Sequence, residues 1–278
     1  MSKPPYTQNL QTKNPGCIIF MVDQSGSMAA ADPKTQHSLA FTAKRATDLT
    51  ISEIVAACIK QGVVMPRVWI GAYGYSTQYP NNVKWIIKGK QYDTADHAGL
   101  ISIVDLEETD NEYYDDNNEL FINDYAEEAA NGGTPMGSAF DEVLSLVENF
   151  AQNHSSAHPP IVINISDGEP TDMSLADMEA KAQALRGITT TDGDALLWNI
   201  HVSAADPNPI VCPDAGTKMP DAYADAMLAS ASAMPDAHKT NAAARGIQVG
   251  ETAKCCVYNA DANTLVQMLS FASSVVDL

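Results

Sequence analysis

The residues best suited to chemistry follow a short apolar run near the start of the chain. Six apolar residues at 17–22 are followed by Asp23, Ser25 and Ser27. A continuous apolar run of this length is typical of a strand buried on both faces of a parallel sheet, and sites in such sheets form beyond the carboxyl ends of the strands. One carboxylate and two hydroxyls suit a hard cation such as Mg²⁺. The same residues are also compatible with a turn followed by a helix N-cap.

Two later stretches favour the metal interpretation. The glycine-rich segment 132–137 places Thr134 on a loop ahead of a predicted helix, and a second apolar run at 161–166 ends at Asp167. Because both runs that end in Asp are expected at the centre of one parallel sheet, Asp23 and Asp167 should lie side by side. Thr134 should lie just before an adjoining helix. Two carboxylates balance a divalent ion without over-neutralising it, so the ion could still attract a further carboxylate.

With these positions in order, the chain resembles the von Willebrand factor A family, also called the integrin inserted-domain family, over about residues 15–278. That family builds a metal-ion-dependent adhesion site from Asp-x-Ser-x-Ser, then a Thr, then an Asp. Within that family, the Thr-Pro-Met-Gly and Asp-Gly-Glu-Pro-Thr-Asp stretches of this chain are most similar to those of intracellular bacterial members, such as the tellurite-resistance-associated group. The resemblance implies a protein-interaction module that binds Mg²⁺, or Mn²⁺ or Ca²⁺ in its place. An Asp or Glu of a partner protein would complete the coordination of the ion. The five residues of this chain that would hold the ion are Asp23, Ser25, Ser27, Thr134 and Asp167.

Two more acidic residues lie on the loop that follows Asp167. Glu169 and Asp172 are within five residues of it. They could be acceptors that hold the metal-binding hydroxyls, or a negative rim that selects partners. They could also belong to a solvated Asp-Gly turn at the start of a helix.

Catalytic motifs are missing from the sequence. No Gly-x-Ser-x-Gly elbow and no phosphate-binding loop ending in Gly-Lys-Ser/Thr occur. The six histidines are scattered, and none forms a His-Glu-x-x-His pair. We therefore expect a protein that is not an enzyme. A metal-dependent phosphoester hydrolase and a purely structural metal site remain the alternatives.

The composition indicates an acidic globular protein. Sixteen basic and 35 acidic residues give a net charge of −19, which argues against nucleic acid or an anionic membrane as the main partner. The five cysteines are odd in number, so reduced, mostly buried thiols are expected. The first residues contain no apolar signal region, and no apolar run reaches transmembrane length. Together these features predict a cytoplasmic protein.

Alternating strand and helix patterns predict an α/β fold. We expect a doubly wound, Rossmann-like open sheet, mostly parallel with one antiparallel edge strand and with helices on both faces. Residues 1–15 should be an N-terminal arm, and 16–278 one domain with insertions at about 88–130 and 204–253. The acid-rich stretch 105–119 lacks the spacing of a calcium-binding loop, which favours a solvated loop. Strands are predicted at 17–22, 67–75, 83–87, 161–166, 195–203 and 254–259, and helices at 36–60, 120–130, 136–152, 174–185, 220–233 and 261–276.

Overall fold

A computed structural model describes residues 6–32, 35–106, 123–204 and 208–273. They include one sheet of eight strands in the order β11-β12-β10-β7-β1-β4-β5, with β6 also paired to β4. The strands are β1 (Gly16–Asp23), β4 (Val68–Tyr75), β5 (Val83–Trp85), β6 (Ile101–Ser102), β7 (Ile161–Ser166), β10 (Leu196–Val202), β11 (Ile210–Val211) and β12 (Cys256–Ala260).

The predicted fold class is confirmed. The neighbouring pairs among β4, β1, β7, β10 and β12 are all parallel. β5 pairs antiparallel with β4, as expected for the predicted antiparallel edge strand. The short strands β6 and β11 add antiparallel pairs to β4 and β12. The register aligns Val22 of β1 with Ile165 of β7, so the two apolar runs end at the same edge of the sheet.

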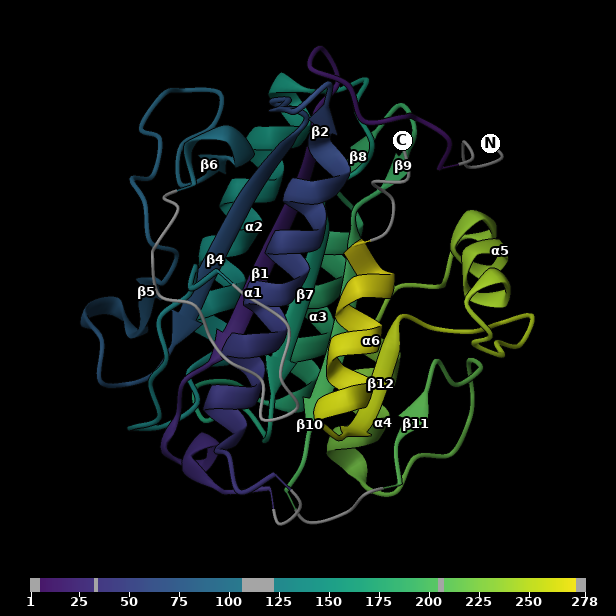
Figure 1. Cartoon of the computed structure of the whole chain (residues 1–278). Helices are drawn as coiled ribbons and strands as arrows, with labels where there is room; N and C mark the ends of the chain where they lie inside the picture. Colours follow the sequence, from purple (N-terminus) through teal and green to yellow (C-terminus); the bar gives the residue numbers. More distant parts are fainter. Residues whose placement is uncertain (1–5, 33–34, 107–122, 205–207, 274–278) are drawn as a thin grey trace.

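Helices cover both faces of the sheet (Figure 1). Alternate residues of β1 point to opposite sides, so Ile18 and Phe20 join one core and Ile19 and Met21 the other. The first core is closed by α1 (Leu39–Cys58) and α6 (Ala262–Ser273), and α5 (Asp236–Ala244) adds Ala242 to it. The second core is closed by α2 (Met136–Asn153), α3 (Leu175–Arg186) and α4 (Ala222–Ser230).

Local hydrogen bonds explain where the helices begin. α1 starts at Leu39 instead of the predicted residue 36, because the Ser38 hydroxyl accepts from the amide of Phe41 and Gln36 has a φ of 60°. The helix predicted at 174–185 is α3, which begins after a reciprocal pair of hydrogen bonds between Ser174 and Asp177.

The helix predicted at 120–130 is wrong over residues 123–130, which are not helical. The amides of Tyr125 and Ala126 donate to the buried carboxylate of Asp48. The segment also pairs with the residues after β5, because the Tyr125 carbonyl accepts from Lys88 and the Glu127 amide donates to Ile86. These tertiary bonds replace those a helix would form. Most of the acidic stretch 105–119 lies outside the described residues.

The predicted helix at 220–233 also differs. The Asp221 side chain caps α4 through the amide of Ala224, and the helix ends at Ser230. After Pro235 the chain forms α5, a helix that the sequence analysis did not predict. Two small hairpins lie outside the main sheet, β2 (Ile59–Lys60) with β3 (Val63–Val64) and β8 (Thr189–Thr190) with β9 (Gly193–Asp194).

All five cysteines are buried and free. Cys255 belongs to one core and Cys256 to the other, as expected for neighbours in an extended chain. Burial raises the pKa of the Cys256 thiol to about 12, which keeps it protonated.

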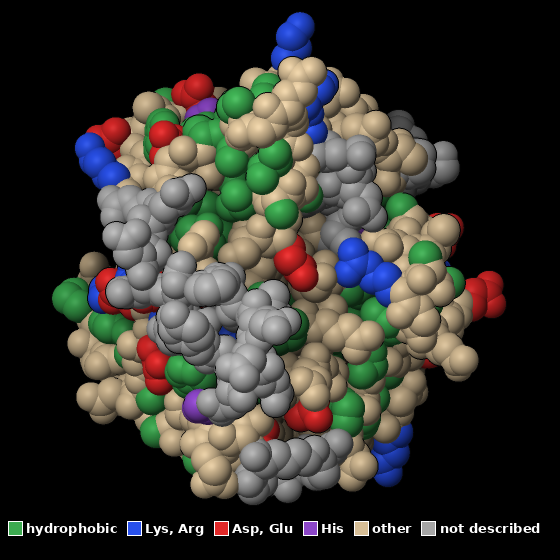
Figure 2. Space-filling view, in the orientation of Figure 1, with side chains coloured by type: hydrophobic (Ala, Val, Ile, Leu, Met, Phe, Trp, Pro, Cys, Tyr) green, Lys and Arg blue, Asp and Glu red, His purple; other side chains and the backbone are tan. Residues whose placement is uncertain are grey.

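The described helices include none with the length and apolar character that a membrane crossing requires. On the face shown in Figure 2, the Lys and Arg side chains lie singly or in small groups among acidic and apolar ones.

Candidate metal site

Four of the five predicted ligands form one hydrogen-bonded chain at the carboxyl ends of β1 and β7. The Ser25 and Ser27 hydroxyls are 3.0 Å apart, and the Ser27 hydroxyl donates to Asp167 Oδ1 at 2.8 Å. The amide of Ser25 donates to Asp23 Oδ1 at 2.8 Å. Ser27 lies in a short 3-10 helix, Gly26–Ala29, that follows β1 directly. The sequence separation of 140 residues between Ser27 and Asp167 is closed by the parallel pairing of the two strands.

Asp23 is fully buried and both of its carboxylate oxygens are engaged. Oδ1 accepts from Ser25, and Oδ2 accepts from the hydroxyl of Ser166 at 2.7 Å. The sequence analysis missed Ser166. The signal that would have found it is its position, because it is the last residue of the second apolar run and directly precedes Asp167.

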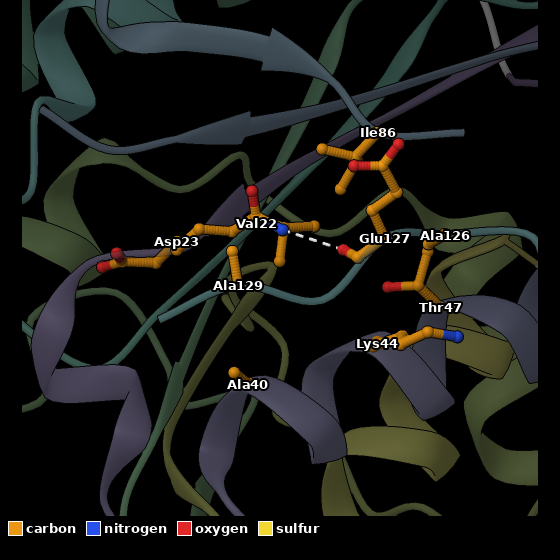
Figure 3. Close-up of a pocket in the computed structure, with 10 residues that line it drawn as sticks. Val22, Asp23, Ala40, Lys44, Thr47, Ile86, Ala126, Glu127 and Ala129 are labelled. Atoms are coloured by element: carbon orange, nitrogen blue, oxygen red, sulfur yellow. Dashed lines mark hydrogen bonds between the residues drawn. The ribbon is translucent and has the colours of Figure 1, made fainter. Parts of the chain in front are cut away.

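The two carboxylates lack a positive neighbour. Burial raises the pKa of Asp23 to about 6, with a smaller contribution from the charge of Asp167, and burial also raises the pKa of Asp167. Within the described part of the chain, no Lys or Arg forms an ion pair with either residue. Figure 3 shows the nearby Lys44 of α1, whose ammonium lies on the side away from the Asp23 carboxylate.

Thr134 is on a loop that is tied to both carboxylate loops. The amide of Gly26 donates to the Gly132 carbonyl at 2.9 Å, and Thr134 and Thr171 exchange two hydrogen bonds. Gly132 has a φ of +77°, and a Cβ there would lie 2.7 Å from the Thr77 hydroxyl, so glycine is required. Thr134 as a residue is 6% exposed, and its hydroxyl forms no hydrogen bond within the described residues.

Asp172 lies against the start of α2. Its carboxylate accepts from the amides of Gly137 and Ser138 at 2.8 and 2.9 Å, and from the Ser138 hydroxyl at 3.0 Å. It therefore caps a helix that is distant in sequence, which is favourable for an anion at a helix N-terminus. Glu169 is exposed on the same loop, and its predicted role as a rim residue stays a prediction.

Two further residues hold the loops in place, and the sequence analysis did not assign them to the site. His201 donates from Nε2 to the Asp167 carbonyl at 3.2 Å and accepts at Nδ1 from the Asn259 amide, so one neutral tautomer satisfies both bonds. Gln24 donates to the Glu127 carbonyl at 2.8 Å, the dashed line in Figure 3, and accepts from the Tyr79 hydroxyl. His201 lies near the carboxyl end of the strand predicted at 195–203, which is where residues that hold a site at this edge of the sheet are expected.

The hydroxyls and carboxylates lie close enough together to ligate one cation. The separations of 2.8 and 3.0 Å along Ser25, Ser27 and Asp167 are ordinary O–H···O hydrogen-bond lengths, so they do not distinguish Mg²⁺ from Ca²⁺. Among the described residues, no three His, Cys, Asp or Glu side chains gather to hold a metal, so a ligand set here must include hydroxyls.

No family model matches the sequence. No curated protein matches it either. Among solved structures, the chain is similar to the pilus adhesin SpaC from Lactobacillus rhamnosus GG, with a TM-score of 0.51 and 11% identity over 97% of this chain and 31% of the adhesin chain. It is also similar to a von Willebrand factor type A protein from Catenulispora acidiphila, with a TM-score of 0.39 and 16% identity over 68% of this chain and 34% of that one. A third is the manganese-loaded TRAP protein from Plasmodium vivax, with a TM-score of 0.36 and 15% identity over 68% of this chain and 57% of that one.

At these identities the likeness to SpaC shows the fold alone. The solved structures similar to this chain include von Willebrand factor A proteins at low identity. The matched region is 31% of the SpaC chain and 34% of the Catenulispora chain, so this chain spans about a third of the length of each.

Proposed function

We propose that this protein is a metal-dependent protein-interaction module. Asp23, Ser25, Ser27, Thr134 and Asp167 would hold one divalent cation, Mg²⁺ or, in its place, Mn²⁺ or Ca²⁺. The observation that carries the proposal is the buried Asp23 and half-buried Asp167, joined by serine hydroxyls and paired with no Lys or Arg among the described residues. A divalent ion would supply the missing charge and replace those hydrogen bonds without large movement of the loops.

The ion would keep the capacity to bind a further oxygen ligand. Two carboxylates balance its charge, and the hydroxyls add none, so an Asp or Glu of a partner protein would be attracted to an open coordination position. Serine and threonine hydroxyls are weak ligands in comparison, which leaves the ion a stronger Lewis acid toward the partner. This use follows from the resemblance to the von Willebrand factor A family and is a proposal for this chain.

A non-enzymatic role is favoured over phosphoester hydrolysis. A hydrolase would need a general base near the metal. His201 is in contact with the Asp167 loop, but both of its ring nitrogens are already engaged. No Lys or Cys is among the residues whose bonds build the site. Membership of the tellurite-resistance-associated group and a cytoplasmic location stay predictions from the sequence motifs.

The metal is tested by titration with Mn²⁺, followed by electron paramagnetic resonance of the free ion. Wild type should bind one ion per chain, and Asp23→Asn should weaken binding at least tenfold, about 1.4 kcal/mol or more. Asp141→Asn is the matched control, because this exposed carboxylate on α2 pairs with Lys181 and is not one of the five proposed ligands. Equal affinity in wild type and Asp23→Asn would overturn the site.

The use of the metal is tested with acetate as a stand-in for a partner carboxylate. Acetate should displace bound water and lower the proton relaxivity of the Mn²⁺-loaded protein, and the effect should be lost in Asp23→Asn. Unchanged relaxivity would instead indicate a closed, structural metal. Metal-dependent turnover of para-nitrophenyl phosphate that Asp23→Asn abolishes would replace the proposal with the hydrolase.

A further inference from the structure

A cleft of about 970 Å³ lies at the other edge of the sheet from the candidate metal site. Its walls come from the end of α3, the start of β10 at Leu196, the segment 232–237 that leads into α5, and Tyr6. β10 begins where the parallel strands begin, whereas Asp23 and Asp167 lie where they end. In Figure 1, α5 stands at the upper right and the carboxyl end of β1 lies at the bottom.

The cleft contains two cations that lack counter-ions. Arg186 and Lys254 both line it and are half-buried. No described carboxylate forms an ion pair with either, whereas the described ion pairs engage five other lysines. Burial lowers the pKa of Lys254, and the nearby charge of Arg186 lowers it further. Two like charges held together in a chain of net charge −19 need a specific reason.

Both side chains have hydrogen-bond donors to spare. Arg186 donates from Nε to the Ala182 carbonyl and from Nη1 to the Ala231 carbonyl, both at 3.3 Å, which leaves its Nη2 group unengaged. These two bonds also fix the guanidinium in place. The Lys254 ammonium forms no hydrogen bond in the described part of the chain. A fixed guanidinium beside a free ammonium is a geometry that recognises carboxylate and phosphate groups.

The remaining walls are partly apolar and include two carboxylates. Leu196, Met234 and Pro235 are buried residues of the lining. Of the two lining carboxylates, Asp236 pairs with Lys239. The other, Asp194, lies beside Tyr6, where burial and this charge raise the pKa of the phenol to about 12, so the phenol stays protonated.

We propose that this cleft binds a small organic anion, with its carboxylate or phosphate group between Arg186 and Lys254 and its apolar body against Leu196 and Met234. The volume is within the range of small-molecule sites, about 300–1,000 Å³. The anion would supply a negative charge to two side chains that pair with no carboxylate among the described residues. The site is separate from the metal ligands, so it does not depend on the proposed function.

Calorimetric titration with inorganic phosphate, phenyl phosphate and benzoate at fixed ionic strength tests the proposal. At least one ring-bearing probe should bind with one-to-one stoichiometry, and phenyl phosphate should bind more tightly than inorganic phosphate, because only its ring buries apolar surface. Benzoate against phenyl phosphate decides which head group is preferred. Lys254→Gln should weaken the tightest probe at least tenfold. Arg245→Gln, a cation at the end of α5 that does not line the cleft, is the control and should bind as wild type does.

Arg186 also ties the ends of α3 and α4, so Arg186→Lys is the second variant: it keeps the charge but loses the planar fork, and should weaken binding with the fold intact by circular dichroism. Asp23→Asn should bind the probes normally, which separates this proposal from the metal site. The proposal is overturned if no probe binds saturably, if Lys254→Gln binds as wild type does, or if Arg245→Gln weakens binding equally.

Discussion

Two pairs of carboxylates, one around Lys44 of α1 and one at the carboxyl ends of β1 and β7, differ in how their charge is compensated. Asp48 and Asp124 share Lys44, whose Nζ is 2.5 Å from Asp48 Oδ2 and 2.6 Å from Asp124 Oδ1. Lys88 also pairs with Asp124. Asp23 and Asp167 are joined by serine hydroxyls and have no lysine.

The difference shows what a completed charge network looks like in this protein. Burial raises the pKa of Asp48 to about 6 against the opposing charge of Lys44, while hydrogen bonds and charges of both lysines outweigh burial and lower the pKa of Asp124. At Asp23 only hydrogen bonds oppose burial. Lys44 of α1 lies near Asp23, but its ammonium points away from the Asp23 carboxylate (Figure 3) and pairs with Asp48 and Asp124. Among the described residues no lysine pairs with the carboxylates of the candidate metal site, which is the basis for proposing that a cation binds there.

Removing the lysine from the compensated pair should have the largest effect on stability. Lys44→Met leaves Asp48, which is fully buried, without a cation, and we expect a loss of about 3–5 kcal/mol in the free energy of unfolding. Urea denaturation measures it, and Mn²⁺ affinity should stay within about twofold of wild type, less than 0.5 kcal/mol. A loss below about 1 kcal/mol would mean that the pair behaves as a surface ion pair.

Adding metal should separate the two carboxylate pairs next. At a free Mg²⁺ concentration of 100 times its dissociation constant, wild type should gain about 2.7 kcal/mol of stability. Asp23→Asn should gain no more than about 1.4 kcal/mol, because an affinity at least tenfold weaker leaves Mg²⁺ at no more than about ten times the variant's dissociation constant. Its amide carries no charge, although it can still accept from Ser25 and donate to Ser166. Asp48→Asn should gain as much as wild type, although it starts from lower stability. Equal gains in all three proteins would show that the metal binds elsewhere.

A buried histidine gives a third case. Both ring nitrogens of His238 lack a hydrogen-bond partner among the described residues, and burial lowers its pKa from 6.5 to about 3. Between these values the unfolded chain binds a proton that the folded chain refuses, so stability falls as the pH falls, by up to about 1.4 kcal/mol per pH unit. His238→Leu should remove that part of the slope in denaturation series from pH 7 to pH 4. An unchanged slope would assign the acid sensitivity to other groups, such as His158.

The smallest expected effect concerns Asp172. Asp172→Ala removes the cap of α2 and should cost about 0.5–2 kcal/mol in thermal or urea unfolding. Ser138→Ala, which deletes only the hydroxyl that donates to the same carboxylate, should cost less. If both variants cost the same, the amide contacts contribute little.

The sequence contained enough to predict the sheet, because strands buried on both faces are continuous apolar runs and the two runs ending in Asp23 and Asp167 identify neighbours at the sheet centre. It was insufficient where a distant side chain decides the local structure. The segment around Tyr125 has a composition compatible with a helix, yet the Asp48 carboxylate takes its amides. In the same way, nothing near Asp172 in the sequence predicts its contact with α2. Its carboxylate accepts hydrogen bonds from two amides of α2 that lie 34 and 35 residues earlier in the chain.

The clasp between Asp172 and α2 has a mechanical consequence. The loop 167–172 is hydrogen-bonded at one end to Ser27 and at the other to the first turn of α2, so it links the two. α2 has 18 residues, about 27 Å of rigid rod. At its far end the His154 ring bonds that of His97, which stacks on Trp69 at 3.6 Å. These contacts connect the candidate metal site to an indole near the other end of α2. Trp69 fluorescence during a Mg²⁺ titration, compared with a Trp69→Phe variant, would report whether cation binding changes the surroundings of that ring.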